Sequence, residues 1–130
     1  MVEFALILPV FLLLILATVD FGWALRTYII EQNAAREGAR YWALNGTASC
    51  TTIGTQVTDK APTLSGLTLT YYINDASTTT CSATTTNAVK VSASYDYTYI
   101  TPLGTFFNYV TRGTIPSPLT LSSSATMRVE

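Results

Sequence analysis

Few residues in this 130-residue chain have side chains suited to chemistry, and the commonest catalytic and metal-binding residue is missing. The sequence contains no histidine, so it lacks the usual general base, the usual zinc ligand and any standard Ser–His or Cys–His nucleophilic pair. Its two cysteines, Cys50 and Cys81, are too few for a cysteine zinc site, and the sequence has no glycine-rich phosphate loop. We therefore expect neither enzymatic activity nor a metal or cofactor.

The charge of the chain excludes one class of partner. The net charge is −1, from seven basic and eight acidic residues, and the basic residues are scattered along the sequence. Nucleic-acid binding needs a basic patch, so we expect no nucleic-acid partner. Only 12% of the residues are charged, while serine, threonine and tyrosine are abundant. Such a composition is typical of an extracellular protein surface.

Two carboxylates, Glu3 and Asp20, flank a long apolar segment at the start of the chain, VEFALILPVFLLLILATVDFG. Continued to Leu25, this segment reaches the roughly 20 residues that are needed to cross a bilayer. Asp20 alone can be explained as a boundary residue that reaches the membrane surface. Glu3 would stay charged in an apolar bundle only beside a positive partner. Pro9 removes one backbone donor and is expected to kink or loosen the helix.

The positive charges lie on the unexpected side of the apolar segment. Signal peptides and signal anchors carry Lys or Arg before their apolar run, whereas the first basic residue here is Arg26, which follows it. The segment also runs longer than the apolar region of a signal peptide. We therefore expect that a basic leader preceded Met1 and has been removed.

A helical pattern continues beyond the apolar segment and ends at Asn45-Gly46, where Gly46 can take a left-handed cap. The sequence thus predicts a helical stalk over residues 1–45. Its apolar part covers about residues 1–25, and an amphipathic part covers about residues 26–45. The remaining residues, 46–130, are expected to form a globular head.

Small residues recur at a helical spacing in the amphipathic part of the stalk. Ala35, Ala39 and Ala43 stand four residues apart and make a smooth ridge that lets another backbone approach closely. Packing of this ridge against the protein's own sheet explains the spacing equally well. The helical pattern also places Ile30, Ala34, Gly38 and Tyr41 on one stripe, with Glu31 outside it.

The head is predicted to have an α+β fold, with an antiparallel sheet of three or more strands packed by its apolar face on the upper helix. Alternation and turn residues predict the elements. These are a short helix that begins near Thr51 and is ended by Pro62, strands at Leu67–Ile73, Ala88–Ile100 and Leu119–Val129, a loop at residues 74–87, and a loop-like stretch at residues 102–118 with one helical turn at Phe106–Tyr109.

Both ends of the chain are similar to a known family. The segment VEFALILPVFLLLILATVDFGWALRTYIIEQNAAREGARYWAL resembles the N-terminal domain of TadE-like proteins of bacterial tight-adherence (Tad) pilus systems. The ending SATMRVE is also similar to that of the family. The matching marks are Val2–Leu6, Leu8-Pro9, Asp20–Gly22, Asn33–Arg40 and Ser124–Glu130.

The resemblance implies a structural pilin-like subunit that polymerises with itself or with other pilins through its N-terminal helix. It implies a precursor cut by a prepilin peptidase, a stay in the inner membrane and a final place in an extracellular filament. Glu3, Phe4, Pro9 and Asp20 are the residues that we expect to act in assembly. In type IV pilins a glutamate at the fifth mature position pairs with a neighbour's N-terminal amine. Glu3 matches it in type and context but stands two residues earlier.

In an exported protein we expect Cys50 and Cys81 to form a disulfide, with free or metal-binding thiols as the alternative. Closing a loop of about 30 residues would stabilise the head by roughly 3 kcal/mol. Two alternative functions stay open: a minor or assembly pseudopilin, and a membrane-anchored adhesion module that does not polymerise.

Overall fold

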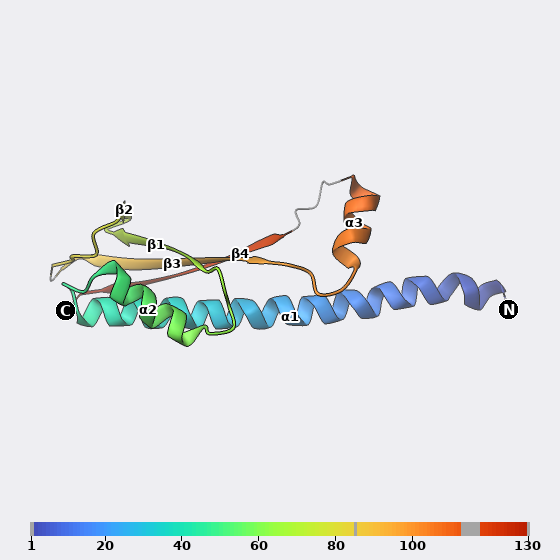
Figure 1. Cartoon of the computed structure of the whole chain (residues 1–130), viewed down its shortest axis with the longest axis horizontal. Helices are drawn as coiled ribbons and strands as arrows, with labels where there is room; N and C mark the ends of the chain where they lie inside the picture. Colours follow the sequence, from blue (N-terminus) through green and yellow to red (C-terminus); the bar gives the residue numbers. More distant parts are fainter. Residues whose placement is uncertain (1, 85, 113–117, 130) are drawn as a thin grey trace. The chain divides into compact units, whose positions relative to one another are not determined.

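The computed structural model describes residues 2–84, 86–112 and 118–129, and it has an α+β fold with one long helix at the N-terminus (Figure 1). The four strands form one antiparallel sheet in the order β2-β1-β3-β4. This confirms the predicted fold class. The elements are α1 (Val2–Leu44), α2 (Cys50–Lys60), β1 (Thr68–Ile73), β2 (Ala76–Thr78), β3 (Ala88–Tyr97), α3 (Leu103–Thr111) and β4 (Leu119–Arg128).

The chain divides into two compact units, each of which contains one part of α1. The helical unit comprises Met1–Arg26 and Tyr97–Leu119, and the sheet unit comprises Thr27–Asp96 and Thr120–Glu130. The division within α1 falls near Arg26, where the predicted apolar part of the helix ends. The amphipathic part of α1 thus belongs to the same compact unit as the sheet.

The helix α1 runs without interruption through Pro9 and ends at Leu44. The stop at Asn45-Gly46 is confirmed, and the amide of Asn45 donates to the carbonyl of Tyr41 over 3.0 Å. The left-handed cap expected at Gly46 is wrong, because Gly46 does not have a positive φ. A side chain there would instead meet the carbonyl oxygen of Ala83, whose amide donates to the Gly46 carbonyl over 2.7 Å. Gly46 therefore permits a close backbone approach.

The short helix predicted to begin near Thr51 is confirmed as α2, and the spacing of its apolar residues matches its buried side. Ile53 and Val57, one turn apart, are its buried residues and face the core. The hydroxyl oxygen of Ser49 caps the helix by accepting from the amide of Thr52 over 3.2 Å. The helix ends at Lys60, two residues before Pro62, which cannot continue it.

The sheet corrects the prediction of a loop at residues 74–87. Asn74 and Asp75 both have positive φ angles and make a two-residue hairpin turn between β1 and β2, with Ile73 paired to Ala76. Three residues are too few to show an alternating pattern, which is why β2 could not be recognised. Residue 85 of the predicted loop lies outside the described residues.

The other strands match their predictions closely. The strand β1 pairs antiparallel with β3, for example Tyr71 with Val91. In β3 the alternate residues Val89, Val91, Ala93 and Tyr97 are buried, as the alternation predicts, but the strand ends at Tyr97 and not at Ile100. The strand predicted at Leu119–Val129 is β4, which ends one residue earlier, at Arg128.

The loop-like stretch predicted at residues 102–118 is helical over its first half, where α3 contains the predicted turn at Phe106–Tyr109 but is longer than one turn. Pro102 occupies the N-cap position, and Arg112 ends the helix in a left-handed conformation with φ 52°. Residues 113–117 of the predicted loop lie outside the described residues. Leu103 at the start of α3 is buried. The glycine and threonine residues of α3 are weak helix formers, so packing of the apolar face of the helix stabilises it.

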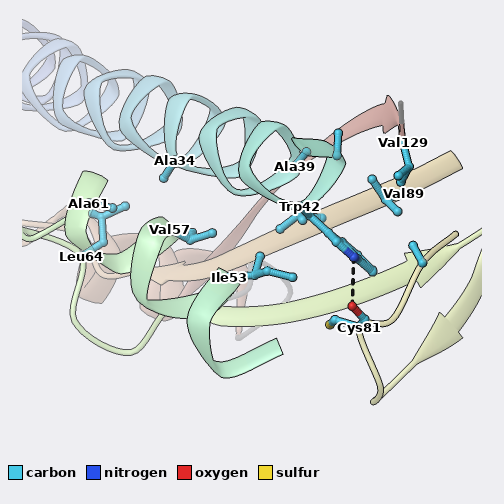
Figure 2. Close-up of a cluster of buried hydrophobic side chains, with 13 residues drawn as sticks. Ala34, Ala39, Trp42, Ile53, Val57, Ala61, Leu64, Cys81, Val89 and Val129 are labelled. Atoms are coloured by element: carbon cyan, nitrogen blue, oxygen red, sulfur yellow. Dashed lines mark hydrogen bonds between the residues drawn. The ribbon is translucent and has the colours of Figure 1, made fainter. Parts of the chain in front are cut away.

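The core of the sheet unit gathers around Trp42, which is fully buried between α1, α2 and the sheet (Figure 2). Its indole N–H donates to the carbonyl of Cys81 over 3.1 Å. Its ring meets that of Tyr71 edge to face, and the Tyr71 hydroxyl donates to the carbonyl of Cys50 over 3.0 Å. Cys50 and Cys81 are joined by a disulfide, as predicted. Both ends of the crosslink are therefore tied to the core by an aromatic side chain.

Candidate assembly surface

The N-terminal half of α1 exposes nearly all of its described apolar side chains. The exposed fractions are 80% for Phe4, 60% for Phe11 and 69% for Phe21. The helix contains an 18-residue stretch long and apolar enough to cross a membrane, and only 6% of that stretch is buried within the molecule. An apolar surface of this extent is unfavourable in water, so it must be covered by lipid or by protein.

Glu3 and Pro9, two of the predicted assembly residues, lie on this exposed half of α1. Glu3 is in the first turn, where the free amides of a helix N-terminus favour a negative charge. Its side chain is exposed, as is that of Phe4. Pro9 lies in the interior of the helix and lines an apolar cleft between α1 and α3.

Asp20, the fourth predicted assembly residue, is buried in the helical unit and is 4% exposed. One carboxylate oxygen accepts from the backbone amides of Ile100 and Thr101 over 3.0 and 3.2 Å. The other oxygen accepts from the hydroxyl of Thr101. Asp20 thus holds the segment between β3 and α3 onto α1. Sequence reasoning found the residue but missed these partners, which stand about 80 positions later in the chain.

Replacing Asp20 with alanine should release this segment from α1. Hydrogen bonds to a charged group contribute about 1.5–3 kcal/mol each, so we expect the amides of Ile100 and Thr101 to exchange with solvent roughly tenfold faster or more. Hydrogen exchange of the full chain in detergent micelles, followed by mass spectrometry, measures this. The control is Tyr97→Phe, because the Tyr97 hydroxyl donates to the backbone carbonyl of Asp20 and not to its carboxylate. Unchanged exchange in Asp20→Ala would show that the carboxylate does not hold the segment.

The alanine ridge lies in the core of the sheet unit. Ala35 and Ala39 are fully buried, and Ala43 is 8% exposed. Packing within the chain itself is one of the two roles that their spacing allowed, and contact with a second chain stays a prediction. The helix α2 approaches this face of α1 closely at Gly38, where a Cβ atom would overlap with Cγ2 of Val57.

The same face of α1 carries a carboxylate that sequence reasoning placed elsewhere. Glu31 is fully buried, and neither of its carboxylate oxygens has a hydrogen-bond partner among the described residues. Burial raises the pKa of Glu31 from 4.5 to about 7, and the backbone of Ser123 lowers the pKa by less, with a geometry short of a hydrogen bond. The available signal in the sequence was the spacing of Glu31, which stands four residues after Thr27 and four before Ala35. The structure buries both of these residues.

The described residues offer no arrangement for metal chemistry, since they contain no group of three or more His, Cys, Asp or Glu side chains that could hold an ion. The described part of this surface consists mainly of exposed apolar side chains, with the exposed carboxylate of Glu3 at its end.

Comparison with known proteins gives a match to the helix that carries this surface. No curated protein and no solved structure matches the chain. A family model described as TadE-like protein matches residues 1–40, which comprise most of α1. The predicted similarity at Ser124–Glu130 lies outside the matched range. Residues 1–40 of this chain are thus similar to the TadE-like family, in agreement with the resemblance seen in their sequence.

Proposed function

We propose that the chain is a structural pilin-like subunit of an extracellular Tad-type filament and that it polymerises through the apolar half of α1. The TadE-like segment suggests a Tad pilus-associated protein. The observation that carries the proposal is the exposure of this half, from Phe4 to Leu25, on an otherwise folded molecule. In the proposed sequence of events, the helix first anchors the subunit in the inner membrane and then becomes the core of a filament of identical subunits or of several pilins.

Apolar burial keeps the apolar half of α1 out of water before and after this step, first in lipid and then in the filament. Moving apolar surface out of water contributes about 25 cal/mol per Å², and lipid and a bundle of neighbouring helices both provide a suitable environment. Transfer from one to the other exchanges similar surroundings, so it does not expose α1 to water. The precursor would be cut by a prepilin peptidase, which removes the basic leader and leaves a new N-terminal amine close to Glu3.

Replacing Glu3 with alanine should block or slow entry into filaments while membrane insertion and head folding survive. Removal of the charge makes the segment more apolar, which favours insertion. The loss is a charge-assisted contact with an N-terminal amine in an apolar bundle. Breaking such a pair commonly costs about 3–5 kcal/mol, and a loss of only about 1.4 kcal/mol weakens each addition step tenfold.

Filament number and length, measured by electron microscopy in cells that produce each variant, test this prediction. Glu3→Gln keeps the size of the side chain but removes the charge, so it should behave like Glu3→Ala. The matched control is Glu37→Gln on the same helix, since Glu37 forms only a surface ion pair with Arg40 at 3.7 Å. Normal filaments in both Glu3 variants would mean that the carboxylate has no part in assembly.

A further inference from the structure

The C-terminal end of α3 carries a positive charge beside exposed apolar side chains. Arg112 follows the last turn of the helix in a left-handed conformation, and its side chain is exposed. Tyr109 and Val110, just before it, are 87% and 59% exposed. Arginine cannot lose its proton in a protein, so it cannot enter an apolar environment as a neutral group. Whatever covers this end of α3 must therefore supply a counter-charge or leave Arg112 in water.

The position of α3 along α1 is set within the helical unit. Pro102 and Leu103 line an apolar cleft together with α1 residues between Pro9 and Leu16, and Asp20 holds the turn before α3. Figure 1 shows α3 starting beside α1 and leading away from it. With nine residues, α3 is about 13 Å long, whereas packed helices lie about 8–10 Å apart. A second helix that packs on α1 at this level would therefore lie along α3.

The described part of the helical unit offers Arg112 no counter-charge from its own chain. Its carboxylates are Asp20, which binds the segment before α3, and Glu3, which is exposed in the first turn of α1. Neither forms an ion pair with Arg112. Glu3 stands six residues before Pro9 and thirteen before Leu16, which separates it from the cleft by about 9–20 Å along α1. Glu3 is thus an exposed charge that is left for a contact between chains.

We propose that α3 is a docking surface for the N-terminal segment of a second copy of this chain, with Arg112 as the counter-charge of that copy's Glu3. The inference rests on the proposed function, since the second copy is the neighbouring subunit of the filament. The two surfaces are complementary, because each is apolar and each ends in one charge of opposite sign.

The proposed contact also defines how the two copies are placed. Phe4, which is 80% exposed, would be covered against the apolar side of α3. The second copy would be displaced along α1 by about 9–20 Å, the distance that separates Glu3 from the level of the cleft. A carboxylate has two oxygens and can accept from several donors, so Glu3 can contact Arg112 and an N-terminal amine together.

Charge reversal in cells that produce the full chain tests the proposal, with filament number counted by electron microscopy. Glu3→Arg and Arg112→Glu each bring two like charges together, whereas the double variant restores a pair of opposite charges in inverted order. The matched control is Lys60→Glu, because this exposed residue at the end of α2 undergoes the same change of charge outside the helical unit. Mapping of the Cys50–Cys81 disulfide checks that the sheet unit of each variant has folded.

We expect each single reversal to lower filament number roughly tenfold or more, while Lys60→Glu leaves it unchanged. The double variant should recover roughly threefold or more relative to either single variant. Recovery is partial because the reversed charge at position 3 also meets the N-terminal amine.

Normal filaments in Arg112→Glu would overturn the inference and leave polymerisation through α1 intact, since Glu3 would then pair with the amine alone. Loss in both single variants without recovery in the double variant would also overturn it, because the counter-charge of Arg112 would then belong to lipid or to another pilin. Absence of filaments of the wild-type chain would instead overturn the proposed function itself.

Discussion

Replacing Gly38 with alanine is expected to destabilise the sheet unit by about 1–3 kcal/mol, the usual cost of overpacking a core. In an exposed helix this change would stabilise by up to about 1 kcal/mol, because alanine is the better helix former. Here the new Cβ would overlap with Cγ2 of Val57, and Ile53 and Val91 lie within 4 Å of it. Val57 is fully buried and its branched side chain has little rotamer freedom. The clash therefore exceeds the gain in helix propensity.

Urea unfolding of the full chain in detergent micelles measures this loss of stability. The transition is followed through the fluorescence of the buried Trp42. Gly22→Ala is the matched control on the same helix, since no atom lies within 4 Å of a Cβ placed there. Val57→Ala in the Gly38→Ala background makes room for the new methyl group. The double variant should be more stable than the sum of the two single losses implies, by about 1 kcal/mol or more. Strict additivity would mean that the two residues do not meet.

Replacing Glu31 with glutamine should remove a pH dependence from the stability of the sheet unit. In the folded chain the pKa of Glu31 is about 7, compared with the ordinary value of 4.5 for a glutamate carboxyl group. Between these values the folded chain holds a proton that the unfolded chain has lost, so stability falls as pH rises. The contribution of the Glu31 carboxyl group to stability is therefore fully present below about pH 4.5. It declines between about pH 4.5 and pH 7, and the stability then levels off. The total decline is up to about 3 kcal/mol.

The same unfolding measurement, repeated from pH 4 to pH 8, tests this prediction. The wild-type chain and the Glu37→Gln control should both lose stability over the window, because Glu37 is a surface residue whose ion pair with Arg40 contributes little. Glu31→Gln should show a flatter profile, since its amide cannot take up the proton. A profile in Glu31→Gln as steep as that of the wild-type chain would contradict the assignment to this carboxyl group.

The sequence predicted those features that depend on neighbours in the chain. Alternation along β3 identified Val89, Val91 and Ala93, and the i+4 spacing of Ile53 and Val57 identified α2. The apolar run of α1 was equally clear, because its pattern covers a single uninterrupted helix. In each case the local pattern and the final environment agree.

The features that the sequence did not predict depend on distant partners. Nothing near Asp20 indicates that Thr101 will donate to it, and nothing near Leu103 shows that α3 will find an apolar surface on α1. Glu31 was placed outside the stripe that contains Gly38, and charged residues are normally kept out of a core. Its burial follows from its place on the same face as Gly38, where α1 meets α2 and the sheet.

Cryo-electron microscopy of material sheared from cells that produce the full chain shows whether this chain polymerises through the apolar half of α1. We expect helical filaments in which this chain is the repeating subunit and residues Phe4 to Leu25 lie in the interior. Filaments built from another subunit, or this chain found only as discrete particles that need detergent, would contradict it.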